Sequence, residues 1–173
     1  VVAVERDPDL PAVLADTLYP WREKFLLIEK DALNLTAADI GEPLPNKFVS
    51  NLPYAVAATV VLDYFQQFPF LESATVMVQK EVADRMAAER GTKNYGAYTV
   101  KLGLYAEVAG RFAVGPGNFF PPPRVDSAVI RLNRRVPRMA DGAPAAPEVI
   151  AAACLMADAA FANRRKTLAN SCK

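Results

Sequence analysis

Short apolar runs alternate with helical patterns along most of this chain, and this alternation limits the possible fold more than any other feature. We predict strands at the apolar runs Val1–Val4, Phe25–Ile28, Lys47–Ser50 and Ala74–Gln79. We predict helices over 8–18, 36–40, 56–67 and 80–90 from the spacing of apolar residues. Strand–helix–strand order requires a mostly parallel, doubly wound α/β sheet of the Rossmann-like type, because parallel strands need long crossovers.

The second half of the chain departs from this alternation. A helix is predicted over 96–106, and strands over Val108–Val114 and Ser127–Leu132. Only a loop rich in glycine and proline separates these two strands, so we expect an antiparallel pair at one edge of the sheet.

The chain is expected to divide into three parts. Residues 1–135 form the α/β domain, and 136–147, rich in proline and alanine, form a linker. A helix over Pro147–Phe161 and a basic tail over 162–173 begin a small helical domain, counted from residue 148. Because the chain opens on a strand at Val1, we also expect a segment to precede it.

Composition excludes several kinds of site. The chain has no histidine, which excludes Ser-His-Asp triads, Cys-His pairs and histidine-based metal sites. Its two cysteines, Cys154 and Cys172, cannot form a structural zinc site alone, so we expect no metal and a reducing, cytoplasmic location. The most apolar stretch, Ala55–Leu62, is too short to cross a bilayer, and no signal peptide is visible.

The net charge of +1 conceals an uneven distribution. Residues 1–110 carry ten lysines and arginines against fifteen aspartates and glutamates, whereas residues 111–173 carry ten against four. This asymmetry suggests an acidic catalytic half and a basic surface for a polyanion, although chance over short windows would give the same pattern.

Acidic residues follow the first two predicted strands, where a doubly wound sheet binds its ligands. Glu5 ends the first strand, and Asp31 with Ala32 follows the second. A carboxylate at the first position can accept hydrogen bonds from ribose hydroxyls, and one at the second can accept from an adenine amino group. Each residue alone reads equally well as an exposed turn residue, but together they indicate a cofactor that carries a nucleoside.

The tetrapeptide Asn51-Leu52-Pro53-Tyr54 follows the third strand. Proline stiffens the turn, so the Asn51 side-chain oxygen and a carbonyl of Leu52 or Pro53 can converge on one point. Converging acceptors suit a planar amine that attacks an electrophilic carbon, and the Tyr54 ring could stack on the same base. The alternative is an ordinary Asn-Pro turn with a core tyrosine.

A rigid aromatic loop lies between the last two strands. Residues 119–125 read Phe-Phe-Pro-Pro-Pro-Arg-Val, and three prolines would fix Phe119 over the second face of a base stacked on Tyr54. The alternative is a hairpin loop that closes the core, which we expect at least for Phe120.

Five motifs together resemble the KsgA/Dim family of small-subunit rRNA adenine dimethyltransferases, which use S-adenosylmethionine. They are NLPY at 51–54, VQKEVADRM at 78–86, KNYG at 93–96, NFFPPPRVDSAVIRL at 118–132 and FANRRKT at 161–167. The resemblance covers nearly the whole chain. It departs from the family in two places, because the G-x-G-x-G loop that wraps the methionine part of the cofactor is absent and the C-terminal helical domain is short. The family's central first strand would lie between the strand at Val1 and the strand ending at Ser50.

The resemblance implies a role for each candidate residue. Glu5 would hold the cofactor ribose, and Asp31 with Ala32 its adenine. Asn51, also counted with the cofactor residues, would hold the target amine together with Leu52 and Pro53. Tyr54 and Phe119 would sandwich the target base. RNA contacts are expected at Arg124, Arg164, Arg165 and Lys166.

The resemblance also implies the reaction. A monomer would dimethylate two adjacent adenosines near the 3′ end of small-subunit rRNA within a pre-ribosomal particle, as part of subunit biogenesis. Two alternatives stay open: an erythromycin-resistance-type methyltransferase of large-subunit rRNA, and an inactive ribosome-assembly factor that binds RNA.

Overall fold

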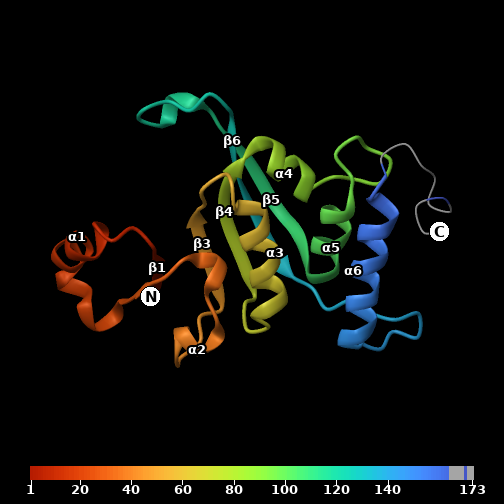
Figure 1. Cartoon of the computed structure of the whole chain (residues 1–173), viewed down its shortest axis with the longest axis horizontal. Coiled ribbons are helices and arrows are strands. Elements are labelled where there is room, and N and C mark those ends of the chain that lie inside the picture. Colours follow the sequence, from red (N-terminus) through yellow and green to blue (C-terminus); the bar gives the residue numbers. More distant parts are fainter. Residues whose placement is uncertain (164–169, 171–173) are drawn as a thin grey trace.

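The computed structural model describes residues 1–163 and 170, and within them the strands form two separate sheets (Figure 1). The strands are β1 (Val2–Glu5), β2 (Leu26–Glu29), β3 (Lys47–Asn51), β4 (Ser73–Gln79), β5 (Ala106–Val114) and β6 (Ser127–Arg134). The α-helices are α1 (Leu10–Thr17), α2 (Ala37–Ile40), α3 (Ala57–Gln67), α4 (Lys80–Met86), α5 (Ala97–Tyr105) and α6 (Pro147–Phe161). Short 3₁₀ helices are η1 (Tyr19–Lys24), η2 (Ala32–Asn34) and η3 (Pro116–Asn118).

The strand pairing confirms the predicted mostly parallel α/β fold with an antiparallel edge pair. β1 pairs with β2 in parallel, and β3 pairs with β4 in parallel. β6 runs antiparallel to both of its neighbours, in the order β3-β4-β6-β5. Each parallel pair brings the carboxyl ends of its two strands together, and Glu5 and Asn51 lie at the ends of β1 and β3.

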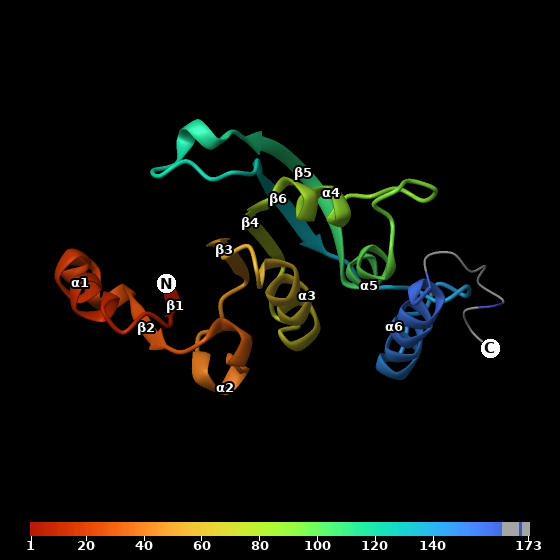
Figure 2. The same cartoon turned by 45° about the horizontal axis from the view of Figure 1, so that its top comes forward.

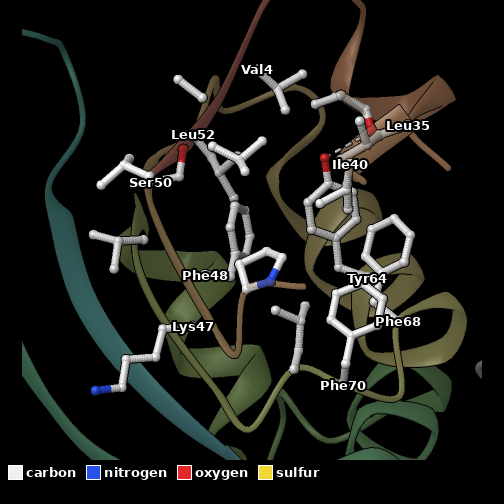
Figure 3. Close-up of a pocket in the computed structure, with 17 residues that line it drawn as sticks. Val4, Leu35, Ile40, Lys47, Phe48, Ser50, Leu52, Tyr64, Phe68 and Phe70 are labelled. Carbon is white, nitrogen blue, oxygen red and sulfur yellow. Dashed lines mark hydrogen bonds between the residues drawn. The ribbon is translucent and has the colours of Figure 1, made fainter. Parts of the chain in front are cut away.

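No strand in the described part of the chain joins β1 to β3. A cavity of about 310 Å³ lies between them, lined by Val2 and Val4 on one side and by Phe48 and Ser50 on the other (Figure 3). Both strands therefore present an unpaired edge to the cavity.

The core lies between the four-stranded sheet and its helices. Figure 2 shows α3 and α5 on the same side of this sheet. Val60 and Phe65 of α3 join one buried cluster with Val76 of β4 and Ile130 of β6, and each is at most 1% exposed. The other face of the sheet is partly open, and Phe112 on β5 is 62% exposed. Apolar burial on one face therefore holds β4 and β6 at the centre of the domain.

Two predicted helix boundaries were wrong. The helix expected over Lys80–Arg90 ends at Met86, where the Thr99 hydroxyl of α5 donates to the Arg85 carbonyl at 2.8 Å. The hydroxyl from the next helix thus satisfies a carbonyl that the end of α4 leaves without a partner, so the chain can leave the helix there. The first helix was expected to start at Pro8, but it starts at Leu10.

The last helix was predicted correctly, with α6 spanning Pro147–Phe161. It packs on α5, and an ion pair of 2.8 Å joins Lys101 to Asp158. Within the predicted linker, Arg138 and Pro144 form an isolated β-bridge, so this stretch is locally ordered. None of the helices described by the structure has the length and apolar character needed to cross a bilayer.

Candidate active site

The two predicted carboxylates lie at neighbouring strand ends. β1 ends at Glu5, and the Lys30 backbone N–H that follows β2 donates to the Glu5 carbonyl at 3.0 Å. Arg6 links the two ends through a 2.9 Å ion pair with Asp31. The sequence-based placement of Glu5 and Asp31 at one edge is therefore confirmed as geometry, whereas their roles remain predictions.

Local hydrogen bonds orient both carboxylates. Glu5 Oε1 accepts from the backbone N–H groups of Arg6 and Asp7 at 2.7 and 2.8 Å. Asp31 Oδ1 accepts from the Leu33 N–H at 3.0 Å and so caps η2. A carboxylate has two oxygens, and each oxygen can accept two hydrogen bonds. Glu5 and Asp31 can therefore each accept further hydrogen bonds from hydroxyl or amino groups. This acceptor chemistry fits the ribose and adenine of a nucleoside.

Ala32 is fixed by a bond from the core. The Tyr64 hydroxyl of α3 donates to the Ala32 carbonyl at 3.1 Å (Figure 3). Burial, with a smaller effect of the Asp31 charge, raises the pKa of Tyr64 to about 12, so this phenol stays a donor at neutral pH. The backbone next to Asp31 is therefore anchored to the helix that follows the NLPY segment.

The Asn51-Leu52-Pro53-Tyr54 segment leaves β3 and leads into α3. Asn51 is the last residue of β3 and is exposed. Leu52 is 4% exposed, and its N–H donates to the Met77 carbonyl at 3.2 Å, which anchors the segment to β4. The Pro53 carbonyl accepts from two N–H groups at the start of α3, both at 3.1 Å. Of the two carbonyls considered, that of Leu52 is therefore the better candidate acceptor for a target amine.

The ring of Tyr54 is held from a distant strand. Its hydroxyl and that of Ser127 lie 2.7 Å apart, and Ser127, the first residue of β6, is fully buried. Tyr54 itself is half-buried. The bond crosses 73 positions of sequence and fixes the ring at the carboxyl edge of the sheet. Sequence reasoning missed Ser127, since a serine at the start of an apolar strand does not reveal its partner.

Phe119 and Phe120 differ in their environments. Phe119 follows η3 and is half-buried, whereas Phe120 is fully exposed. The expectation that Phe120 closes the core was wrong, because the following prolines hold the chain in the loop that Figure 1 shows extending past the strand ends. In the described part of the chain, no aromatic contact joins Phe119 to Tyr54. The base sandwich therefore remains a prediction.

One predicted RNA contact lies next to these residues. Arg124 lines a hollow of about 310 Å³ with Gln79, Lys80 and Asp126. The Lys80 N–H donates to the Asp126 carbonyl at 2.9 Å and ties the base of the loop to α4. The predicted contacts Arg164, Arg165 and Lys166 lie outside the described residues. Among residues 1–163 and 170, no group of three or more histidine, cysteine, aspartate or glutamate side chains could hold a metal.

Comparison with known proteins gives consistent matches along the chain. The family described as Ribosomal RNA adenine dimethylase matches residues 1–172. Ribosomal RNA small subunit methyltransferase A of Streptomyces griseus is 45% identical over 172 residues, which cover 97% of this chain and 57% of that protein. The protein of the same name from Thermobifida fusca is 41% identical over 174 residues, with the same two coverages. The chain thus spans little more than half the length of these relatives.

Two solved structures share the fold. A dimethyladenosine transferase from Plasmodium falciparum has a TM-score of 0.75 and 24% identity, covering 99% of this chain and 58% of that one. The 23S rRNA methyltransferase ErmE has a TM-score of 0.72 and 25% identity, covering 99% and 65%. The identity to the two small-subunit relatives is therefore higher than the identity to ErmE.

Proposed function

Because the chain belongs to the Ribosomal RNA adenine dimethylase family, we propose that it forms much of the catalytic part of a methyltransferase that modifies adenosines in small-subunit rRNA. The observation that carries the proposal is the end of β3. There an exposed Asn51 precedes Tyr54, whose ring is held by the buried Ser127. An amide acceptor next to a fixed aromatic ring is the arrangement that a flipped-out adenine needs.

The cofactor proposed is S-adenosylmethionine, which supplies an electrophilic methyl group on its sulfonium. Glu5 would accept hydrogen bonds from the ribose hydroxyls, and Asp31 with Ala32 would contact the adenine. Both carboxylates lie at neighbouring strand ends and keep acceptor positions, which supports this assignment.

The residues at the end of β3 would position the target amine. The Asn51 side-chain oxygen and the Leu52 carbonyl would accept its N–H groups, so that the nitrogen lone pair points toward the methyl carbon. Catalysis then depends on positioning rather than on a strong general base, which agrees with the absence of histidine. The amine proton would leave through these acceptors to water.

Aromatic stacking would stabilise the extruded base. Flipping a base out of its stack costs a few kcal/mol. Each base–aromatic contact contributes about 1–3 kcal/mol, so stacking by Tyr54 and Phe119 would offset that cost. Arg124, with Arg164, Arg165 and Lys166, would contact phosphates of the RNA.

The same site would act repeatedly on two adjacent adenosines within a pre-ribosomal particle. The alternative substrate, large-subunit rRNA, is less favoured because identity to the small-subunit relatives is higher than to ErmE. The alternative of an inactive assembly factor is less favoured because Glu5, Asp31, Asn51 and Tyr54 are all present, each at or just after the carboxyl end of β1, β2 or β3.

The experiment offers the protein two substrates. Small and large ribosomal subunits that lack adenine methylation are incubated separately with the protein and S-adenosylmethionine, and the RNA nucleosides are measured by mass spectrometry. We expect N6,N6-dimethyladenosine in small-subunit rRNA only. Product in large-subunit rRNA, or in neither, would contradict the proposal.

A further inference from the structure

A second cleft lies away from the Asn51–Tyr54 segment, between the loop that follows α4 and the C-terminal end of α6. Its volume is about 1350 Å³. Its lining comes from α4, from the loop and start of α5, and from the end of α6, and includes Lys93, Asn94, Tyr95, Tyr98, Phe161 and Asn163. Figure 1 shows the loop beside the end of α6, both toward the top of the view, where the loop between β5 and β6 also lies.

Aromatic side chains form part of the wall of this cleft. The rings of Tyr95 and Phe161 meet edge to face, with centroids 6.0 Å apart. Tyr98 is fixed, since its hydroxyl donates to the Ala58 carbonyl of α3 at 3.0 Å. Phe161, the last residue of α6, is 41% exposed, so its side chain keeps an exposed surface. A planar group could stack there without displacing either ring.

Polar groups surround the rings. Lys93, Asn94 and Asn163 are all exposed. Arg85 is paired with Glu81 at 3.0 Å, whereas Lys93 makes no ion pair with the residues that the structure describes. Side-chain amides can donate to and accept from base edges, and an unpaired lysine can contact a phosphate.

We propose that this cleft binds an unpaired nucleotide of the RNA substrate at a distance from the target adenosine. The inference rests on the proposed function, because it assigns the cleft to the same RNA. An aromatic surface with amide groups and an exposed lysine has the chemistry of single-strand recognition, in which bases stack on rings and cations contact phosphates. The base would stack on the exposed surface of Phe161, against Tyr95, and Lys93 would contact its phosphate.

The first test measures binding of a probe RNA. The affinity of a fluorescein-labelled eight-nucleotide single-stranded RNA is measured by anisotropy for the protein and its variants. Phe161→Ala should weaken binding by roughly five- to 150-fold, the range expected for one base–aromatic contact. Phe161→Tyr, which keeps the ring, should bind nearly as the parent protein does. Leu155→Ala is the matched control, because Leu155 is 71% exposed on the same helix and does not line the cleft.

A second variant separates binding from packing. Lys93→Glu changes an exposed side chain and leaves the contact between Tyr95 and Phe161 in place. It should weaken RNA binding and lower the slope of log affinity against log salt by about 0.7, the value for one phosphate on a single strand. It should also raise KM for ribosomal particles while leaving kcat and the affinity for S-adenosylmethionine nearly unchanged.

The outcomes distinguish this inference from the proposed function. If the parent protein methylates small subunits and Phe161→Ala and Lys93→Glu bind the probe as tightly as the parent, the cleft inference is wrong. The same holds if these variants lose affinity only for intact particles and not for free RNA, since a ribosomal protein would then occupy the cleft. If the variants lose RNA affinity but the parent protein transfers no methyl group, the proposed function fails and the cleft assignment stands.

Discussion

The bond between Tyr54 and Ser127 allows an asymmetric prediction about stability. Tyr54→Phe removes one hydroxyl and leaves Ser127 Oγ fully buried without its partner. Leaving a buried polar group unsatisfied costs about 1–3 kcal/mol. Ser127→Ala removes the buried serine hydroxyl itself and leaves the Tyr54 hydroxyl on a half-buried side chain. We therefore expect a loss closer to the net contribution of one hydrogen bond, about 0.5–1.5 kcal/mol. Tyr54→Phe should therefore be the more destabilising change. The double variant should lose less unfolding free energy than the two single variants lose together.

Urea unfolding of the two single variants, the double variant and the parent measures these differences. Tyr98→Phe is a matched control, because it also removes a tyrosine hydroxyl bonded at 3.0 Å but lies on α5. Both tyrosine variants should lose stability, so Tyr98→Phe serves as the control for the cost of a lost tyrosine hydroxyl. Tyr54→Phe should also lower methyl transfer, because the lost hydroxyl bond holds the ring that is proposed to position the base. The reasoning would be refuted if Tyr54→Phe and Ser127→Ala lost equal unfolding free energy and the double variant lost the sum of the two.

Two further predictions concern stability. Hydrogen bonds from Lys30 and Thr36 lower the pKa of Asp39 from 3.8 to about 2. The stability that ionised Asp39 contributes is therefore present above pH 3.8 and is lost as the pH falls toward 2. Asp39→Asn should make the unfolding free energy depend less on pH in that window, and an unchanged dependence would contradict this prediction. The Arg134 guanidinium donates to the carbonyls of Phe68, at 2.7 Å, and Leu71. Arg134→Lys should cost about 1.5–3 kcal/mol in urea unfolding, because one ammonium cannot reproduce this fork, and a cost below the error of the measurement would show that these bonds contribute nothing.

Local patterns were sufficient to predict most of the fold. A short apolar run identified β4, and an apolar helical run opened by a proline identified α6 with its bounds. The end of α4 was not predictable, because the Thr99 hydroxyl that bonds the helix end comes from the next helix. The six-residue η1 was also missed, since its sequence shows no apolar spacing at helical intervals.

For the candidate site, the sequence supplied the position of each residue along the chain but not its contacts, and the roles of these residues stay predictions. The rule that ligands bind at the carboxyl ends of parallel strands singled out Glu5, Asp31 and Asn51, and the structure places Glu5 and Asn51 at the ends of β1 and β3 and Asp31 just after β2. The rule could not show that the Pro53 carbonyl is occupied by two N–H groups of α3, or that Ser127 holds Tyr54. Both depend on how distant segments pack.

The central claim is that Asn51 positions the amine that accepts the methyl group. Single-turnover methyl transfer to unmethylated small ribosomal subunits should fall about tenfold or more in Asn51→Ala, because the variant lacks an acceptor aimed at the reacting nitrogen. The affinity for S-adenosylmethionine, measured by calorimetry, should stay nearly unchanged. Asn46→Ala is the matched control, since Asn46 immediately precedes β3 at its other end and bonds Glu72. Transfer by Asn51→Ala at the rate of the parent protein would contradict the account.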